Sequence, residues 1–228
     1  MSQKFEAQVI KKEKVSSKVY CVTFQLLSPP TILFTAGQNM MVMMGTGVNR
    51  TMSIASPPSL NSSVLMAHDT SPQGPGSKWT DNLKIGDTAF FVAPTGGVLS
   101  FIDSPRKKVM VATGTGVAPF RSMILDKKNY PMVLYWGLRR QEDVFWKEEF
   151  DELQQLFSNF SWRLIYSKPS ENWTGDKGHV TEYVMNNEKD MENSEFYLCG
   201  NKAMVSEVSA KLLERNVPKE QIKMELFY

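Results

Sequence analysis

The sequence predicts two domains, an antiparallel β-barrel or sandwich followed by an α/β domain with a parallel sheet. In the first part of the chain, short apolar segments are separated by turn residues, which is typical of antiparallel strands. In the second part, runs typical of buried strands alternate with segments of helical spacing. A polar, proline-containing stretch at 104–108 lies between these parts, so we place the domains at 1–104 and 105–228.

Alternation and turn residues indicate the strands of the first domain. Every second residue of 20–26 is large and apolar, which predicts a half-buried strand, and two prolines at 29–30 end it. Continuous apolar runs at 40–44 and 64–67 predict two further strands. A turn at 83–87 leads into a predicted strand at 88–92.

Strands and helices alternate in the second domain. Apolar runs predict buried strands at 109–112, 132–136, 162–166 and 196–199. Apolar residues at helical spacing predict helices at 120–125, at 143–157 with Trp146 on the apolar face, and at 205–212, and alternation predicts a last strand at 222–226. This order implies a parallel sheet with helices on both faces and right-handed connections. Ligands of such sheets bind beyond the carboxyl ends of the strands.

Composition sets broad limits on function. The chain has 228 residues, of which 42% are hydrophobic and 22% charged, as in soluble globular proteins. The net charge of +2 gives no argument for binding nucleic acid or an anionic membrane surface. No apolar run is long enough to span a bilayer, and the first residues lack the apolar core of a secretion signal. We therefore expect a cytoplasmic protein without a membrane span.

Cysteine and histidine are scarce. Cys21 and Cys199 cannot supply an iron–sulfur cluster or a disulfide framework. His68 and His179 lie far apart in the sequence, so we expect no metal site.

A glycine-rich segment follows the first predicted strand of the second domain. Gly114-Thr115-Gly116 stands between that strand and a predicted helix, with Pro119 shortly after. Glycines allow close approach of the backbone to an anion, and the free N–H groups of a helix start point at it. A tight turn without function is the alternative. Cys199-Gly200 occupies the same kind of position after a later strand.

Five motifs in matching order resemble the ferredoxin–NADP reductase family. They are Arg50-Thr51-Met52-Ser53, Gly74-Pro75-Gly76-Ser77, residues 114–119, residues 199–205 and the ending Glu225-Leu226-Phe227-Tyr228. The resemblance covers nearly the whole chain. It implies an antiparallel β-barrel domain that binds FAD, followed by an α/β parallel-sheet domain that binds NAD(P). It also implies an enzyme that transfers hydride between NAD(P)H and flavin and passes electrons to a separate acceptor.

The resemblance assigns residues to FAD. Arg50, a fixed cation with a planar donor fork, suits the flavin pyrophosphate, and Gly74, Gly76 and Ser77 offer N–H groups and a hydroxyl to it, with Ser77 opening a short helix. A surface ion pair and a plain turn are the alternatives. The family usually has an aromatic residue where Met52 stands, which affects how tightly the flavin is held. The remaining assigned residues are Thr51, Ser53, Met66, Ala67, His68, Pro75 and Thr115.

Three residues match positions that the family places around the reacting rings. The resemblance implies that Ser53 hydrogen-bonds the reactive flavin nitrogen and that Glu225 feeds a proton through Ser53. Cys199 then packs beside the nicotinamide and is not a nucleophile. A core cysteine and a solvent-facing glutamate are the alternatives.

The chain ends with two aromatic residues, Phe227 and Tyr228. The family commonly ends in an aromatic that covers the flavin, which maps to Phe227, with Tyr228 as an additional ring. Such a cover must move before nicotinamide can stack on the flavin. A plug of the interdomain groove is the alternative.

The choice between NADPH and NADH is ambiguous in the sequence. Ser167-Lys168 and Lys177 align with family positions that bind a 2′-phosphate, and His179 with one that stacks on adenine. In contrast, Trp173-Thr174-Gly175 followed by Gly178 resembles members that use NADH. We favour NADPH. The other residues assigned to NAD(P) are Gly114, Thr115, Gly116, Pro119, Cys199, Gly200 and Met204.

The acceptor is not visible in the sequence. Because no iron–sulfur cysteines are present, the resemblance implies a separate redox partner such as ferredoxin, flavodoxin or an oxygenase component. Three alternatives stay open: an electron-transfer subunit of a larger oxygenase or reductase complex, an NAD(P)H-dependent reductase of free flavin, and a nucleotide-binding module without flavin.

Overall fold

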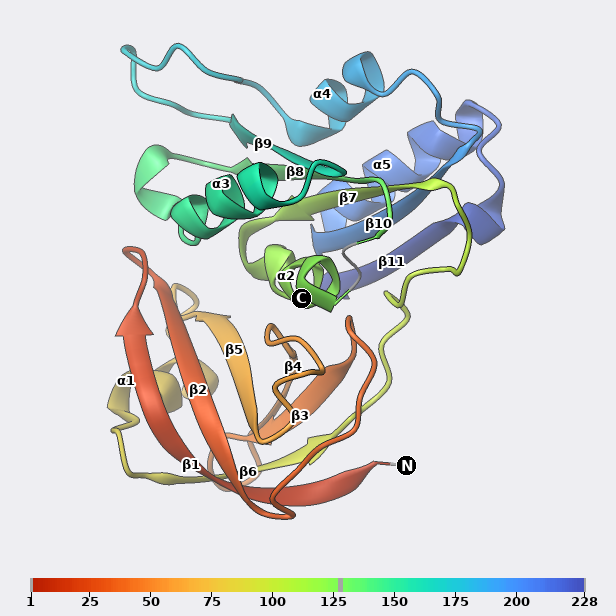
Figure 1. The fold of residues 1–228 in the computed structure, drawn as a ribbon. Coiled ribbons are helices and arrows are strands. Elements are labelled where there is room, and N and C mark those ends of the chain that lie inside the picture. Colours follow the sequence, from red (N-terminus) through yellow and green to blue (C-terminus); the bar gives the residue numbers. More distant parts are fainter. Residues whose placement is uncertain (1, 127–128, 228) are drawn as a thin grey trace. The chain divides into compact units, whose positions relative to one another are not determined.

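The computed structural model describes residues 2–126 and 129–227. The chain divides into two compact units. Unit 1 comprises residues 1–100 and 118–126, and unit 2 comprises residues 101–117 and 127–228. Figure 1 shows the elements of both units.

Unit 1 is built on six antiparallel strands (Figure 1). They are β1 (Gln3–Lys14), β2 (Val19–Ser28), β3 (Asn39–Met43), β4 (Asn49–Ser53), β5 (Ser63–Asp69) and β6 (Thr88–Ala93). Their order is β4-β3-β6-β1-β2-β5, and the outermost strands β4 and β5 contact each other. The sheet therefore curls into a near-barrel, which confirms the antiparallel barrel and decides against the sandwich.

The barrel core follows from alternation along each strand. In β2, Val22 and Phe24 are fully buried, whereas Thr23 between them is partly exposed. Phe24 and Phe5 pack on Phe91, with ring centroids 6.0 and 5.5 Å from that ring. The sequence analysis missed β1, whose buried residues at 5, 7 and 9 stand between charged and polar ones.

Unit 1 also contains two helices, α1 (Pro75–Asn82) and α2 (Val117–Asp126). Helix α1 begins at Pro75 with Gly74 as its N-cap, so the expectation that Ser77 opens this helix is wrong. Proline is favoured in the first turn because its missing N–H has no partner there anyway. Ser77 lies within the helix and is buried.

Unit 2 is an α/β domain with a five-stranded, fully parallel sheet (Figure 1). The strands are β7 (Lys107–Thr113), β8 (Met132–Leu138), β9 (Phe160–Tyr166), β10 (Ser194–Asn201) and β11 (Ile222–Phe227), in the order β11-β10-β7-β8-β9. The helices are α3 (Lys147–Leu156), α4 (Val180–Asn187) and α5 (Lys202–Glu214). The predicted parallel sheet is confirmed.

Helices cover both faces of this sheet (Figure 1). Val109 and Val111 of β7 pack in one core with α4 and α5. On the opposite face, Phe150 of α3 packs against Trp136 and Trp162, with ring centroids 6.0 and 5.5 Å apart. No described helix has the length and apolar character to cross a bilayer.

The helix predicted at 143–157 starts later than expected. A short 3-10 turn occupies Gln141–Asp143, and α3 begins at Lys147. Trp146 is the N-cap, with a φ of 56°, and is not part of the helix. Its ring packs against that of the preceding residue, Phe145, with centroids 4.9 Å apart.

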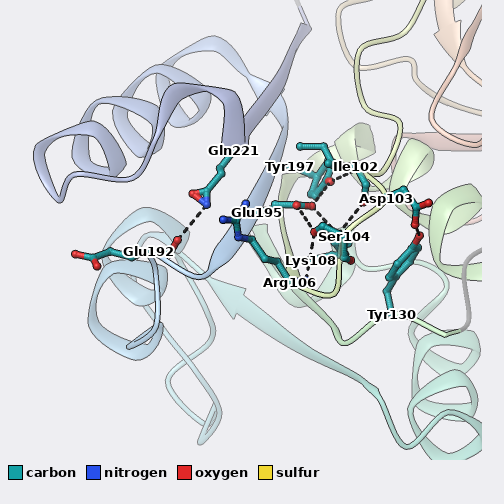
Figure 2. Close-up of polar contacts among 10 residues, drawn as sticks. All are labelled: Ile102, Asp103, Ser104, Arg106, Lys108, Tyr130, Glu192, Glu195, Tyr197 and Gln221. Atoms are coloured by element: carbon teal, nitrogen blue, oxygen red, sulfur yellow. Dashed lines mark hydrogen bonds and ion pairs between the residues drawn. The ribbon is translucent and has the colours of Figure 1, made fainter.

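The amino ends of β7 and β10 contain a buried charge network (Figure 2). Lys108 Nζ lies 2.6 Å from Glu195 Oε2, and both side chains are fully buried. Lys108 also donates to the carbonyls of Ile102 and Ser104, at 2.8 and 3.0 Å. Tyr197 donates to Glu195 and accepts from the Ile102 N–H, both at 2.9 Å. The network thus attaches the segment before β7 to the sheet.

Candidate functional site

Arg50 on β4 lies against the start of α1. A Cβ added to Gly76 would be 3.5 and 3.7 Å from Arg50 Cγ and Nε. Among the described residues, the Arg50 guanidinium donates only to the Asn49 carbonyl, at 2.8 Å, and has no carboxylate partner. An exposed cation beside the free N–H groups of a helix start is suited to bind a phosphate.

His68 on β5 joins the same corner of unit 1. Its Nδ1 lies 2.7 Å from Thr80 Oγ1 on α1. Burial lowers the pKa of His68, and the Arg50 charge acts in the same direction, whereas the Asp69 and Asp81 carboxylates oppose them. His68 therefore favours the neutral form and connects β5 to α1 beside Arg50.

Ser53 ends β4 with a buried hydroxyl. Its Oγ has no hydrogen-bond partner among the described residues, and the residue is only 4% exposed. Buried polar atoms are normally hydrogen-bonded, so an unsatisfied hydroxyl indicates a position that a ligand completes. Ser53 and Arg50 lie on the same short strand.

Other residues that the sequence assigned to FAD lie in the barrel core or on the surface of unit 1. Met52 and Met66 belong to the apolar core of the barrel, and Ala67 is also buried. Thr51 and Pro75 are exposed. The Met52 side chain packs in the barrel core, in keeping with the adaptable thioether of methionine.

Two loops meet at the carboxyl ends of β7 and β10 in unit 2. A Cβ added to Gly116 would lie 2.3 Å from the Cys199 carbonyl oxygen, and one added to Gly200 would lie 2.2 Å from Thr113 Oγ1. Both positions accept only glycine. Gly114 has a φ of 55° and open space around its Cα. The two predicted glycine segments therefore form one continuous surface of main chain.

Cys199 and Glu225 are register partners on β10 and β11. Cys199 is fully buried. Burial, and then the Glu225 carboxylate, raise the pKa of the Cys199 thiol well above its usual value. The thiol is therefore protonated and weakly nucleophilic at neutral pH, which agrees with a packing role.

Basic side chains gather at the carboxyl ends of β8 and β9. The main-chain N–H of Lys168 donates to the Arg139 carbonyl at 2.9 Å. Ser167 is held in the same way by the Leu138 carbonyl at 2.9 Å. Lys177 pairs with Tyr166 through the main chain, in an isolated parallel β-bridge. Arg139, Lys168 and Lys177 are all exposed. The sequence analysis missed Arg139, although its position directly after the strand at 132–138 was a usable signal.

The loop after β9 has a fixed conformation. Trp173 packs edge-on against Tyr166, with ring centroids 4.8 Å apart, and donates to the Asp176 carbonyl at 3.0 Å. A Cβ added to Gly175 would lie 2.4 Å from the Trp173 ring, so a glycine is needed there. Burial and the Asp143 carboxylate raise the pKa of Tyr166 to about 12. The tryptophan thus orders the loop that contains the two lysines.

The remaining assigned residues are placed as follows. Pro119 lies in α2, His179 is the exposed N-cap of α4, and Met204 is a buried residue of α5. Thr115 is partly exposed between Gly114 and Gly116. Phe227 pairs through its main chain with Asn201, and Tyr228 lies outside the described residues.

Comparisons with known proteins agree with this architecture. A family model described as the oxidoreductase NAD-binding domain matches residues 110–210. The chain is 35% identical over 167 residues to the F subunit of the Na(+)-translocating NADH-quinone reductase of Pseudomonas aeruginosa strain UCBPP-PA14, and 35% identical over 169 residues to that of Methylococcus capsulatus. These matches cover 68% and 69% of this chain. The chain spans 41% of the length of each of these relatives.

Solved structures share the fold over the whole chain. A cytochrome P450 reductase from Amycolatopsis matches with a TM-score of 0.92 and 21% identity, over 99% of this chain and 70% of the other. A ferredoxin NADP+ reductase from Neisseria gonorrhoeae, solved with bound FAD and NADP, matches with a TM-score of 0.84 and 20% identity, over 99% of both chains.

Residues 110–210 match an oxidoreductase NAD-binding domain, and the two units have the fold of a ferredoxin NADP+ reductase. The matched domain and the shared fold agree with the resemblance that the five motifs indicated, to the ferredoxin reductase-like family of FAD- and NAD(P)-binding reductases.

Proposed function

We propose that this chain binds FAD in unit 1 and reduces it with NADPH bound in unit 2, for transfer of electrons to a separate redox protein. The observation that carries the flavin assignment is the Arg50 guanidinium, which lacks a carboxylate partner among the described residues and lies beside Gly76 at the start of α1. The unsatisfied Ser53 hydroxyl on the same strand supports it. These residues fit FAD.

Each residue then has a defined task. Arg50 and the first N–H groups of α1 hold the pyrophosphate, and Ser53 donates a hydrogen bond to the flavin ring. Bound FAD supplies the ability to take a hydride and release electrons singly. Cys199 stays protonated and excludes water beside the nicotinamide.

Arg50→Ala tests the flavin site. The loss of a charge-assisted contact costs about 1.5–3 kcal/mol of FAD affinity, so the variant is purified folded but depleted of flavin. Arg50→Lys is the matched control, because it keeps the charge and loses the planar fork. Full flavin occupancy with unchanged affinity in the alanine variant would remove Arg50 from the site.

The preference for NADPH is proposed from the cations at the carboxyl ends of β8 and β9. Lys168 and Lys177 supply positive charge for a 2′-phosphate, and Arg139 adds to it. Replacing both lysines with alanine is expected to raise KM for NADPH and leave KM for NADH nearly unchanged, because only one substrate has the phosphate. Equal losses for both nucleotides, or no loss, would contradict this preference.

A second candidate is an electron-transfer component of a larger assembly. It is favoured by the relatives that are 35% identical, because they are subunits of an NADH-quinone reductase. This chain spans only 41% of their length. Side-by-side turnover of the NADPH-reduced protein with ferredoxin, flavodoxin, free flavin and a dye discriminates the candidates. Turnover with the dye alone would favour this component, whereas turnover with a soluble carrier supports the independent reductase.

A further inference from the structure

Asn201 joins the two glycine loops of unit 2. Its main-chain N–H and its side-chain Nδ2 both donate to Thr113 Oγ1, at 3.0 and 3.2 Å. Its Oδ1 accepts from the Met204 N–H at 2.9 Å and so caps α5. One side chain therefore fixes the end of β7 relative to the start of α5.

These contacts determine whether the Thr113 hydroxyl can donate or accept a further hydrogen bond. A threonine hydroxyl can accept two hydrogen bonds and donate one. Asn201 uses both acceptor positions, and among the described residues the hydroxyl donates to none. Gly200 allows this approach, since a Cβ there would lie 2.2 Å from Thr113 Oγ1. Thr113 is partly exposed, and its hydroxyl can still donate one hydrogen bond. Such a donor suits a ligand oxygen that can only accept a hydrogen bond.

We infer that Asn201 is a positioning residue for the diphosphate of the nucleotide, acting through the Thr113 hydroxyl. This inference rests on the proposed function, which assigns both loops to NAD(P). Phosphate oxygens are acceptors only, so a donor with fixed polarity and position favours them over groups that also donate. Asn201 also joins the end of β7 to the start of α5, so the first N–H groups of α5 keep their place relative to Thr113.

The experiment must separate positioning from helix capping. Asn201→Ser retains an N-cap oxygen but is too short to reach Thr113 as well. Thr113→Val removes the hydroxyl with little change in shape. Asn193→Ser is the matched control, because Asn193 is exposed and its Nδ2 donates to Asp190, at 2.9 Å, away from both loops. Each variant is prepared as the full chain with FAD, and dissociation constants are measured for ADP-ribose, which has the diphosphate, and for AMP, which lacks it.

The inference predicts a loss specific to the diphosphate. Thr113→Val weakens ADP-ribose binding about tenfold, and Asn201→Ser does so about threefold to tenfold. AMP binding, flavin content and Tm stay close to wild type. KM for NADPH rises in parallel, and kcat at saturation stays within about twofold. The double variant Asn201→Ser with Thr113→Val loses no more than Thr113→Val alone, because Asn201 acts through that hydroxyl.

Three results would overturn the inference, and a fourth would overturn the proposed function on which it rests. Multiplied losses in the double variant would show that Asn201 acts independently of Thr113. An unchanged affinity for ADP-ribose in Asn201→Ser, or equal losses for AMP, would reduce Asn201 to a helix cap. If the wild-type protein bound neither ADP-ribose nor NADPH, the proposed function itself would be wrong.

Discussion

The two ends of the parallel sheet in unit 2 have opposite chemistry. At the amino ends of β7 and β10, the charges of Lys108 and Glu195 are sealed from solvent and fully hydrogen-bonded (Figure 2). At the carboxyl ends of the same strands, glycines bring main chain against main chain, and the Thr113 hydroxyl keeps a donor unused by the described residues. The polar groups at the amino end are satisfied by the protein itself, whereas the carboxyl end keeps a hydrogen-bond donor that the described residues do not use.

The two ends of this sheet should contribute differently to folding stability and to nucleotide binding. A charge pair without solvent contact stabilises only when both partners remain, because either partner alone is an uncompensated buried charge. A loop of close backbone contacts instead depends on the absence of side chains. Substitutions at the amino end should therefore change folding, and substitutions at the carboxyl end should change nucleotide affinity.

The largest expected effect is at the amino end. Lys108→Met alone is expected to lower the free energy of unfolding by about 3–5 kcal/mol, because Glu195 is left buried and unpaired. The double variant Lys108→Met with Glu195→Leu should recover at least half of that loss. Urea unfolding measures both values. An additive loss in the double variant would contradict the description of the network as a coupled pair.

Nucleotide affinity should not depend on the charge pair at the amino end. For the folded fraction of Lys108→Met, we expect the dissociation constant for ADP-ribose to stay within about twofold of wild type, since distant sites behave independently. A tenfold loss of affinity would show that the amino end also shapes the nucleotide loops.

The second effect is at Gly116. Gly116→Ala places a Cβ 2.3 Å from the Cys199 carbonyl oxygen, so the two loops must separate. We expect ADP-ribose affinity to fall more than tenfold while flavin remains bound in unit 1. Gly114→Ala is the matched control, because the space around it is open and only its φ of 55° opposes the change. Equal losses in the two variants would mean that backbone strain, and not loop contact, controls binding.

The third effect concerns the reactivity of Cys199. Because burial and Glu225 raise its pKa, the thiol is expected to resist iodoacetamide at pH 8 in the folded protein and to react after denaturation. Mass spectrometry of the labelled peptide measures this difference. Rapid labelling of Cys199 in the folded state would show that the carboxyl end of β10 is open and the thiolate accessible.

The smallest effect is at His68 in unit 1. Its pKa in the folded state is lowered from the ordinary value of 6.5. As pH falls through that value, the unfolded chain binds the proton first, so stability decreases with falling pH. The decrease in unfolding free energy between pH 7.5 and 5.5 should be smaller in His68→Gln than in wild type. Identical decreases in urea unfolding would remove His68 as a contributor.

Much of the fold was predictable because it depends on local patterns. Apolar runs such as 132–136 and alternation such as 20–26 report burial directly, and both are strands in the structure. The strand β1 was missed because lysines and glutamates dilute its alternation. The start of α3 was misplaced because Trp146 has an apolar side chain at helical spacing but adopts a left-handed backbone conformation and is the N-cap.

Only the residues of the candidate site that stand in recognisable motifs could be predicted from the sequence. Arg50 and Gly116 are recognisable in the sequence, and the structure adds what each contacts. The roles of Thr113 and Asn201 depend on pairing between strands 88 residues apart, which no local pattern reports. The burial of Met52 in the barrel core was likewise invisible, because a thioether suits both a core and a cofactor surface.

Anaerobic titration of the FAD-reconstituted protein with NADPH and with NADH, followed by visible absorbance, tests whether this chain binds FAD and reduces it with a nicotinamide nucleotide. We expect the oxidised-flavin band to disappear with an equimolar amount of NADPH, at lower concentration than with NADH, and to return when an electron acceptor is added. Failure to bind FAD, or a bound flavin that neither nucleotide reduces, would contradict the account.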